Sequence, residues 1–295
     1  MQELYYERSR MKRLIILLSL LLVACSQGAP TSSQPDQLPA VTEAPSGTSN
    51  PVSITPSTSS STLPSGPVTL VALGDSLTQG DGDDSGRGYP GRLSEMLNTV
   101  RPGSDLVNLG QSGWSSEALI KGDQGIDSQL DRAVAAIQTA TAQGRGAVAL
   151  VWIGSNDLWY LYEYGGDVNN EGDAQDAQRF AANMDTILSS LRKTGAPVIV
   201  ALLDDQSKRP VALKGEAFTS ITQDELAHMS VQAGRYNIII ATKAAQYGAL
   251  TVDFSDTDVF TDPATLYDDG NHPNQAGYDI IAQKWWDALR PLIGG

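Results

Sequence analysis

The sequence feature that most constrains the fold is a series of short, mostly apolar runs that alternate with longer segments of helical periodicity. Five such runs follow residue 66, at residues 68–73, 105–109, 147–153, 197–203 and 249–254. Short apolar runs that end at turn residues are typical of strands buried inside a parallel sheet. Parallel neighbours need a crossover connection, which is right-handed. The pattern therefore predicts an α/β domain with helices on both faces of a five-stranded parallel sheet.

The segments between these runs have the three- and four-residue spacing of amphipathic helices. We expect a helix at 89–100 and apolar helix faces made by Ile126, Leu130, Val134 and Ile137; by Phe180, Met184, Ile187, Leu188 and Leu191; and by Tyr278, Ile281, Trp285, Leu289 and Leu292. Thr222 and Glu225 have capping-box spacing and open a long helical region that Gly234 could interrupt. Pro273 suits the first turn of the last helix.

The first apolar run stops abruptly at Gly74, Asp75 and Ser76. A serine is thereby placed where a strand ends and a helix starts, at the sheet edge where α/β proteins bind ligands. Its hydroxyl and its N–H would both be exposed at an electropositive helix start, which favours a nucleophile. Asp75 and Ser76 are also ordinary helix-capping residues, so this stretch alone supports either role.

Three further polar stretches follow predicted strands or open the last helix: 108–113, 154–157 and 269–273. With the Gly-Asp-Ser stretch, they make the chain similar to the GDSL or SGNH family of serine hydrolases, whose four blocks carry Ser, Gly, Asn and His in this order. The resemblance extends from about residue 68 to the C-terminus. It implies a flavodoxin-like three-layer α/β/α sandwich with strand order 2-1-3-4-5.

The resemblance also assigns site residues. Ser76 would be the nucleophile, His272 its general base, and Asp269 the carboxylate that orients the imidazole and stabilises its charged form. The oxyanion of the tetrahedral intermediate would be bound by the backbone N–H groups of Ser76 and Gly113 and by the side-chain amide of Asn156.

Several of these residues have simpler interpretations when taken singly. Gly113 and Asn156 could each be turn residues. Asp268 competes with Asp269 for the orienting role, although the Asp-x-x-His spacing of the family selects Asp269. Ser112 is the alternative nucleophile of an α/β-hydrolase, but its surroundings do not match the Gly-x-Ser-x-Gly elbow of that fold.

Aromatic residues stand close to the candidate site in the sequence. Trp114 follows the oxyanion glycine and Trp159 lies just beyond Asn156, so both are candidates for a wall of the substrate site. The competing interpretation is that these rings pack against the edge of the sheet. His228, the other histidine of the chain, lies in a predicted helix and is expected to have a structural role.

The predicted activity is that of a serine esterase or acyl hydrolase that cleaves carboxylic esters through an acyl-enzyme, without a metal or organic cofactor. The acidic triplet Asp81, Asp83 and Asp84 lacks the glutamate of a calcium-binding loop and is interpreted as a solvated turn. By resemblance, the substrate would be a small-molecule, glycan or lipid acyl ester. The alternative is a non-catalytic, surface-tethered binding module on the same fold. A formal net charge of −14 argues against a nucleic-acid partner.

The N-terminus has the features of an export signal. Basic residues precede the apolar run 14–24, which is too short to span a bilayer but suits the core of a signal peptide. The run ends at Cys25, the only cysteine of the chain, in a sequence that resembles a bacterial lipobox. We therefore expect residues 1–25 to be a lipoprotein signal, starting at Met1 or Met11, and Cys25 to be lipidated.

The next segment, residues 26–66, is rich in Ser, Thr and Pro and has almost no large apolar side chains. Such a composition cannot bury enough surface to offset the entropy of ordering, so a disordered tether is expected. The hydrolase domain would then be residues 67–295. The resemblance to lipoproteins places the protein in the bacterial cell envelope, anchored to a membrane by lipid and facing outside the cytoplasm.

Overall fold

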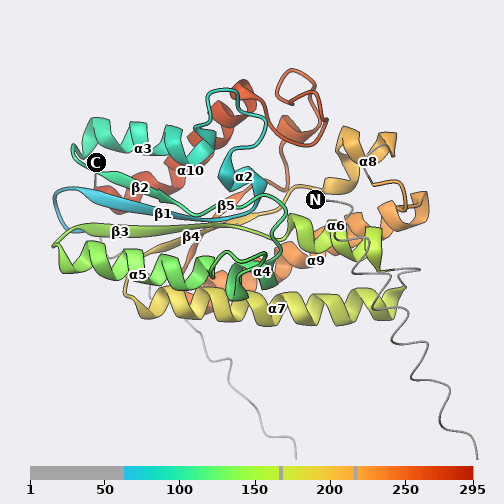
Figure 1. Ribbon diagram of the computed structural model, residues 1–295, viewed down its shortest axis with the longest axis horizontal. Helices are drawn as coiled ribbons and strands as arrows, with labels where there is room; N and C mark the ends of the chain where they lie inside the picture. The colour runs from blue at the N-terminus through green and yellow to red at the C-terminus, as the bar shows by residue number, and fades with distance from the viewer. Residues whose placement is uncertain (1–62, 166–168, 216–217, 295) are drawn as a thin grey trace, which may run out of the picture. The chain divides into compact units, whose positions relative to one another are not determined.

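A computed structural model of the chain describes residues 63–165, 169–215 and 218–294. Within these residues, five strands form one parallel sheet in the order β2-β1-β3-β4-β5 (Figure 1). The strands are β1 Val68–Gly74, β2 Asp105–Asn108, β3 Gly146–Trp152, β4 Val198–Leu202 and β5 Leu250–Asp253. The predicted number, direction and order of the strands are confirmed.

Helices cover both faces of the sheet. They are α2 Ser76–Gln79, α3 Gly88–Val100, α4 Ser116–Lys121, α5 Gln129–Ala142, α6 Ser155–Tyr164, α7 Asn170–Lys193, α8 Pro210–Lys214, α9 Gln223–Tyr247 and α10 Gln275–Ile293, with short 3-10 turns η1 Gln206–Lys208 and η2 Asp258–Phe260. In Figure 1, α3 and α10 lie on one side of the sheet and α5, α7 and α9 on the other. This is the predicted three-layer sandwich. None of the helices in the described ranges has the length and apolar character needed to cross a membrane.

The core explains why the strands could be recognised from the sequence. Every residue of the neighbouring strands β1 and β3 is buried. The candidate site begins at the carboxyl ends of these two strands. In the edge strands β2 and β5, only Val252 is buried. Between the sheet and α10, the ring of Trp152 stacks on Phe254 at 4.2 Å, and Tyr89 stacks on Trp285 at 5.1 Å. These large rings fix the distance between the layers.

Three details of the helices differ from the predictions. Ile126 is 38% exposed, because it lies in the turn at residues 122–128 and not in α5, which starts at Gln129. Gly234 does not interrupt α9, which runs unbroken to Tyr247. Pro273 precedes α10, whose N-cap is Asn274; the side chain of Asn274 accepts a hydrogen bond from Gly277 N. The capping box of Thr222 and Glu225 is confirmed.

The N-terminal boundary of the folded domain also differs. The predicted signal at 1–25, with Cys25, lies outside the described residues, as does most of the predicted tether at 26–66. Its last four residues are described, and Leu63 is buried among core residues. The Leu63 N–H donates a hydrogen bond of 2.9 Å to the carbonyl oxygen of Leu292. The ordered domain thus starts at least four residues before residue 67, because this leucine has an apolar site beside α10.

Candidate active site

The turn that follows β1 places Ser76 at the start of α2. Gly74 has no room for a side chain, since a Cβ there would lie 2.2 Å from the carbonyl oxygen of Trp152. The amide of Gln129 closes this strand end by accepting from Gly74 N and donating to Gly74 O, both at 2.9 Å. The side chain of Asp75 caps α2 by accepting a hydrogen bond of 3.0 Å from Leu77 N. The predicted structural role of Asp75 at the helix start is confirmed.

The structure brings Ser76, His272 and Asp269 into one hydrogen-bonded series. His272 Nε2 lies 2.9 Å from Ser76 Oγ, although the two residues are 196 positions apart. His272 Nδ1 lies 2.6 Å from Asp269 Oδ2. With Asp269 at Nδ1, the tautomer with its proton on Nδ1 leaves Nε2 free to accept a proton from the serine hydroxyl. The imidazole is thus bonded to Asp269, the carboxylate that the family spacing selects.

Asp269 is held in its ionised form. Its Oδ1 accepts backbone hydrogen bonds from Asn271 at 2.8 Å and His272 at 2.9 Å. Burial alone would raise the pKa of Asp269, but the hydrogen bonds from the His272 ring and from the two backbone N–H groups outweigh it and lower the pKa to about 2. A permanent negative charge therefore faces the imidazole at neutral pH.

Gly113 lies in a loop that is pinned to α2. Gly110 of this loop could not carry a side chain, because a Cβ would lie 2.3 Å from Gln79 N. The side chain of Gln79 accepts a hydrogen bond of 2.6 Å from Ser112 N. Gly113 itself has a φ of +78°, which favours glycine, and its carbonyl accepts a hydrogen bond of 2.7 Å from the hydroxyl of Tyr160. The loop is thus fixed between α2 and α6.

Asn156 is the second residue of α6, directly after the buried strand β3. Its Nδ2 donates a hydrogen bond of 3.0 Å to the carbonyl oxygen of Trp114, the residue after Gly113. A side-chain amide has two N–H donors, so one of them remains for a ligand. The structure therefore places the predicted oxyanion-hole residues Gly113 and Asn156 next to one another, beyond the carboxyl ends of β2 and β3, the strands on either side of β1.

Asp157, the residue after Asn156, bonds α6 to a neighbouring helix. Asp157 accepts hydrogen bonds from the backbone N and the Oγ of Ser116, at 2.8 and 2.5 Å, and Asn183 Nδ2 donates to the same Oγ at 2.8 Å. Burial raises the pKa of Asp157 to about 6, against the lowering effect of the Ser116 hydrogen bonds. These contacts join α4, α6 and α7 at the residue that follows Asn156.

The two tryptophans proposed as a substrate wall are buried. Trp114 and Trp159 are each only 2% exposed and both belong to the main core. Trp159 stacks on Phe218 at 4.1 Å. Large apolar rings are commonly buried in this way, and the burial favours a packing role for both over an exposed wall.

Ser112 and His228 lie outside the hydrogen-bonded series of Ser76, His272 and Asp269. The ring nitrogen of His272 that faces a serine is bonded to Ser76, while Ser112 uses its backbone N–H to hold Gln79. His228 lies in α9, and its Nδ1 is 2.8 Å from Asp173 Oδ2 in α7, a contact that joins two helices.

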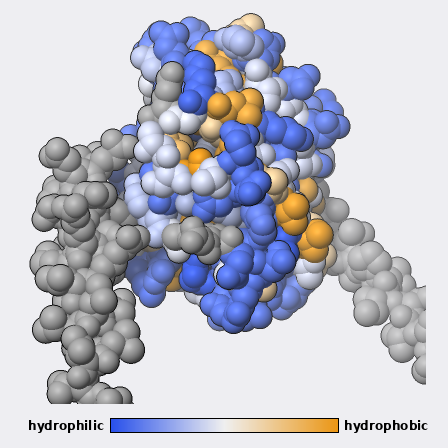
Figure 2. All heavy atoms as spheres, turned by 90° about the vertical axis from the view of Figure 1, so that its right-hand side faces the viewer, coloured by the Kyte–Doolittle hydropathy of each residue, from blue (hydrophilic) through white to orange (hydrophobic). Residues whose placement is uncertain are grey.

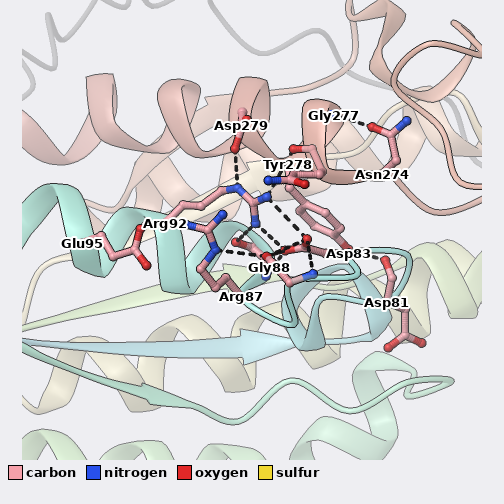
Figure 3. Close-up of polar contacts among 12 residues, drawn as sticks. Asp81, Asp83, Arg87, Gly88, Arg92, Glu95, Asn274, Gly277, Tyr278 and Asp279 are labelled. Atoms are coloured by element: carbon pink, nitrogen blue, oxygen red, sulfur yellow. Dashed lines mark hydrogen bonds and ion pairs between the residues drawn. The ribbon is translucent and has the colours of Figure 1, made fainter.

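The acidic loop after α2 is not the solvated turn that was expected. Asp83 is buried and forms an ion pair with Arg92, whose Nε donates to Asp279 at 2.5 Å (Figure 3). Tyr278 donates its hydroxyl hydrogen to the carbonyl oxygen of Asp81 at 2.9 Å. Burial would raise the pKa of Asp83, but hydrogen bonds from Arg92, Ser85 and Gly88 hold it well below its usual range. The loop is thereby fastened to the start of α10.

This loop also packs against the backbone beside His272. A Cβ at Gly82 would lie 2.6 Å from the carbonyl oxygen of Pro273 and 3.0 Å from the Cβ of His272. The backbone at Gly82 therefore touches the segment that carries the histidine. Within the described part of the chain, no three or more His, Cys, Asp or Glu side chains form a group that could hold a metal ion.

Comparison with known proteins places these observations in a family. The model of the GDSL-like lipase/acylhydrolase family matches residues 72–280, which is more than half of the chain. A search of curated proteins finds no match.

Several solved structures share the fold. The acetylxylan esterase Axe2 of Geobacillus stearothermophilus is 20% identical, with a TM-score of 0.53 over 78% of this chain and 96% of that one. LAE5, an alpha/beta hydrolase from the metagenome of Lake Arreo, is 21% identical, with a TM-score of 0.50 over 78% of this chain and 98% of that one. The psychrotrophic esterase EstA of a Pseudoalteromonas species is 15% identical, with a TM-score of 0.50 over 75% and 96%. At these identities the likeness concerns the fold.

Proposed function

The chain belongs to the GDSL-like lipase/acylhydrolase family and is thus a carboxylic ester hydrolase, and from this premise we propose that it forms its acyl-enzyme on Ser76. The observation that carries the proposal is the hydrogen-bonded series from Ser76 Oγ through the imidazole of His272 to Asp269. A serine hydroxyl becomes a useful nucleophile when a positioned base removes its proton.

In the first half of the proposed reaction, Ser76 Oγ attacks the carbonyl carbon of the ester while His272 Nε2 takes the hydroxyl proton. The carbonyl π electrons move to oxygen and give a tetrahedral oxyanion. The negative charge of Asp269 stabilises the imidazolium that forms. When the intermediate collapses, the bond to the alcohol oxygen breaks, and His272 gives that oxygen the proton. Water then repeats the sequence on the acyl-enzyme and releases the acid.

The proposed oxyanion hole consists of the backbone N–H groups of Ser76 and Gly113 and the Nδ2 of Asn156. Gly113 and Asn156 are fixed before any substrate binds, through the bonds to Tyr160 and Trp114. Donors that are fixed in advance stabilise the developing charge without reorganisation, and each is typically worth about 10²–10³ in rate.

For the substrate, we propose a small-molecule or glycan ester rather than a long-chain lipid. Acetylxylan esterases are among the proteins of similar fold. Figure 2 shows the side of the molecule where α6 and α8 lie; hydrophilic residues dominate it and apolar residues form separate small patches. An enzyme that works on a lipid surface is expected to expose a larger continuous apolar patch. A panel of p-nitrophenyl esters of increasing acyl length, together with acetylated xylan, tests this choice.

The nucleophile is tested by labelling with a fluorophosphonate probe, which reacts with activated serines. We expect the wild-type protein and Ser112→Ala to be labelled and to hydrolyse p-nitrophenyl acetate, and Ser76→Ala to do neither. Labelling and turnover that vanish in Ser112→Ala but persist in Ser76→Ala would contradict the assignment. A protein with no labelling and no turnover would support the alternative of a tethered binding module.

We also propose that the enzyme is anchored by a lipid on Cys25 and acts outside the cytoplasm in the bacterial cell envelope. The support is the signal-like sequence and the lipobox before Cys25. Because Leu63 belongs to the domain, the flexible tether would be residues 26–62, and these 37 residues would have a root-mean-square reach of about 33 Å. Fractionation of cells that express Cys25→Ser should show loss of the lipid and of stable membrane association. Membrane retention of an unlipidated Cys25→Ser protein would refute the anchor.

A further inference from the structure

The turn that carries His272 contacts a buried arginine. Arg209 lies between η1 and α8 and is 1% exposed. Its Nε and Nη2 donate to the two carboxylate oxygens of Asp204 at 2.8 and 2.7 Å, and its guanidinium lies over the ring of Phe260 at 4.4 Å. Burying such a pair costs desolvation that its mutual attraction does not reliably recover. Net stability is therefore a weak explanation for this ion pair.

The remaining guanidinium nitrogen bonds to the catalytic turn. Arg209 Nη1 donates to Asn271 Oδ1 at 2.8 Å and lies 3.4 Å from the Asn271 carbonyl oxygen. Asn271 stands between Asp269 and His272, and its backbone N–H is one of the donors to the Asp269 carboxylate. A displacement of Asn271 would therefore move the carboxylate of Asp269 and the backbone that carries the imidazole of His272.

Two neighbours of Arg209 contact the same turn. The N–H of Val211 donates to the carbonyl oxygen of Gly270 at 3.1 Å. Gly270 has a φ of +67°, and a Cβ on it would lie 3.1 Å from the Cβ of Pro210. Residues 209–211 thus hold the turn 269–272 through its side chain, its backbone and its close packing.

We propose that Arg209 is a positioning residue for ester hydrolysis: it holds the turn 269–272 so that His272 Nε2 faces Ser76 Oγ, and Asp204 holds the guanidinium. This inference rests on the proposed function. An error of about 1 Å in the position of a reacting group can cost about 10² in rate. Lysine cannot replace Arg209, because one ammonium cannot make the forked contact with Asp204 and also reach Asn271.

The most direct test is Asn271→Ala, which removes the acceptor at 2.8 Å and leaves the Arg209–Asp204 pair intact. Arg209→Lys is the second variant, and Arg192→Met is the matched control. Arg192 also holds backbone carbonyls, those of Tyr247 at 2.9 Å and Ala196 at 2.6 Å, but just before β4 and β5, at the other ends of the strands from the site. Each variant is compared with the wild type in steady-state kinetics on p-nitrophenyl acetate, in its rate of fluorophosphonate labelling and in its melting temperature.

We expect Asn271→Ala and Arg209→Lys to lower kcat and the labelling rate by about 10- to 100-fold, with KM changed less than about twofold. The pH at which kcat is half-maximal on the acid side should also shift, because the imidazole would no longer be held against Asp269. Arg192→Met should lower the melting temperature and leave kcat and the pH profile unchanged. A purely structural Arg209 would give this second pattern.

Suppose that folded Asn271→Ala has the kcat, labelling rate and pH profile of the wild type, while Ser76→Ala is inactive. That result would overturn the role of Arg209 and leave the proposed function standing. If Arg209→Lys does not fold, Asn271→Ala decides the outcome. A fully active Ser76→Ala would overturn the proposed function and, with it, the role of Arg209.

Discussion

Asp75 precedes the proposed nucleophile, and its burial lets us predict how the stability of the protein depends on pH. The carboxyl is 0% exposed; Oδ1 accepts the Leu77 N–H, and Oδ2 has no hydrogen-bond partner in the described part of the chain. Burial raises the pKa of Asp75 to about 7, although the Leu77 N–H and the electrostatic effects of Arg209 and His272 oppose the rise. Ionisation of Asp75 should therefore destabilise the wild-type protein as the pH increases, and Asp75→Asn should not be destabilised in this way.

The sign follows from where the carboxyl releases its proton. In the unfolded chain Asp75 ionises near pH 3.8, and in the folded protein near pH 7. Between these values the folded state binds more protons than the unfolded state, so the free energy of unfolding decreases as the pH rises. At about 1.4 kcal/mol for each pH unit, the loss from this group approaches about 4 kcal/mol above pH 7. Asparagine keeps the acceptor for Leu77 N–H but does not ionise.

The assay is urea unfolding followed by circular dichroism at several pH values from 4.5 to 8, for the wild type, Asp75→Asn and Asp268→Asn. We expect the stability of Asp75→Asn relative to the wild type to increase by a few kcal/mol across this range. Asp268 is an exposed carboxyl, and its variant controls for the loss of one negative charge. If the difference between Asp75→Asn and the wild type is the same at pH 4.5 and pH 8, Asp75 does not titrate in this range and the reasoning is wrong.

Three further predictions concern the site. Ser76→Ala and His272→Ala should each abolish turnover in p-nitrophenyl acetate assays, and the double variant should be hardly worse, because the two groups act as a unit; additive losses would contradict this. Asn156→Ala should lower kcat by about 10²–10³ and change KM little, since its amide serves a charge present mainly in the transition state; a defect confined to KM would exclude that role. Gly110→Ala should lower the melting temperature, because its Cβ would lie 2.3 Å from Gln79 N; an unchanged melting temperature would show that the loop can move aside.

The sheet could be predicted from the sequence because its central strands are buried on both faces. β1 and β3 are wholly enclosed, so their sequences are continuous apolar runs with sharp polar ends. Those ends carry Ser76 and Asn156, and the parallel order then brings them to one edge. The order itself came from the family resemblance, since apolar runs do not say which strands are neighbours.

The residues around the site could not be predicted in the same way. Arg209 and Asp204 lie in a polar segment that has no periodicity, and the contact of Arg209 with Asn271 joins positions 62 apart in the chain. Trp114 and Trp159 were candidates for the substrate site only because they are close in sequence to Gly113 and Asn156. Closeness in sequence does not say which way a ring points. Both rings are instead buried in the core.

The position of the imidazole depends on contacts from outside its own turn. His272 lies in neither a helix nor a strand, and such segments are mobile unless other contacts hold them. The turn meets the backbone of Gly82, in a loop fastened by the buried pair of Asp83 and Arg92, and it also bonds to Arg209. A buried ion pair is a poor source of stability, but its fixed geometry is well suited to holding a loop. We therefore infer that the two arginines hold a turn of irregular backbone so that His272 faces Ser76, a residue 196 positions away.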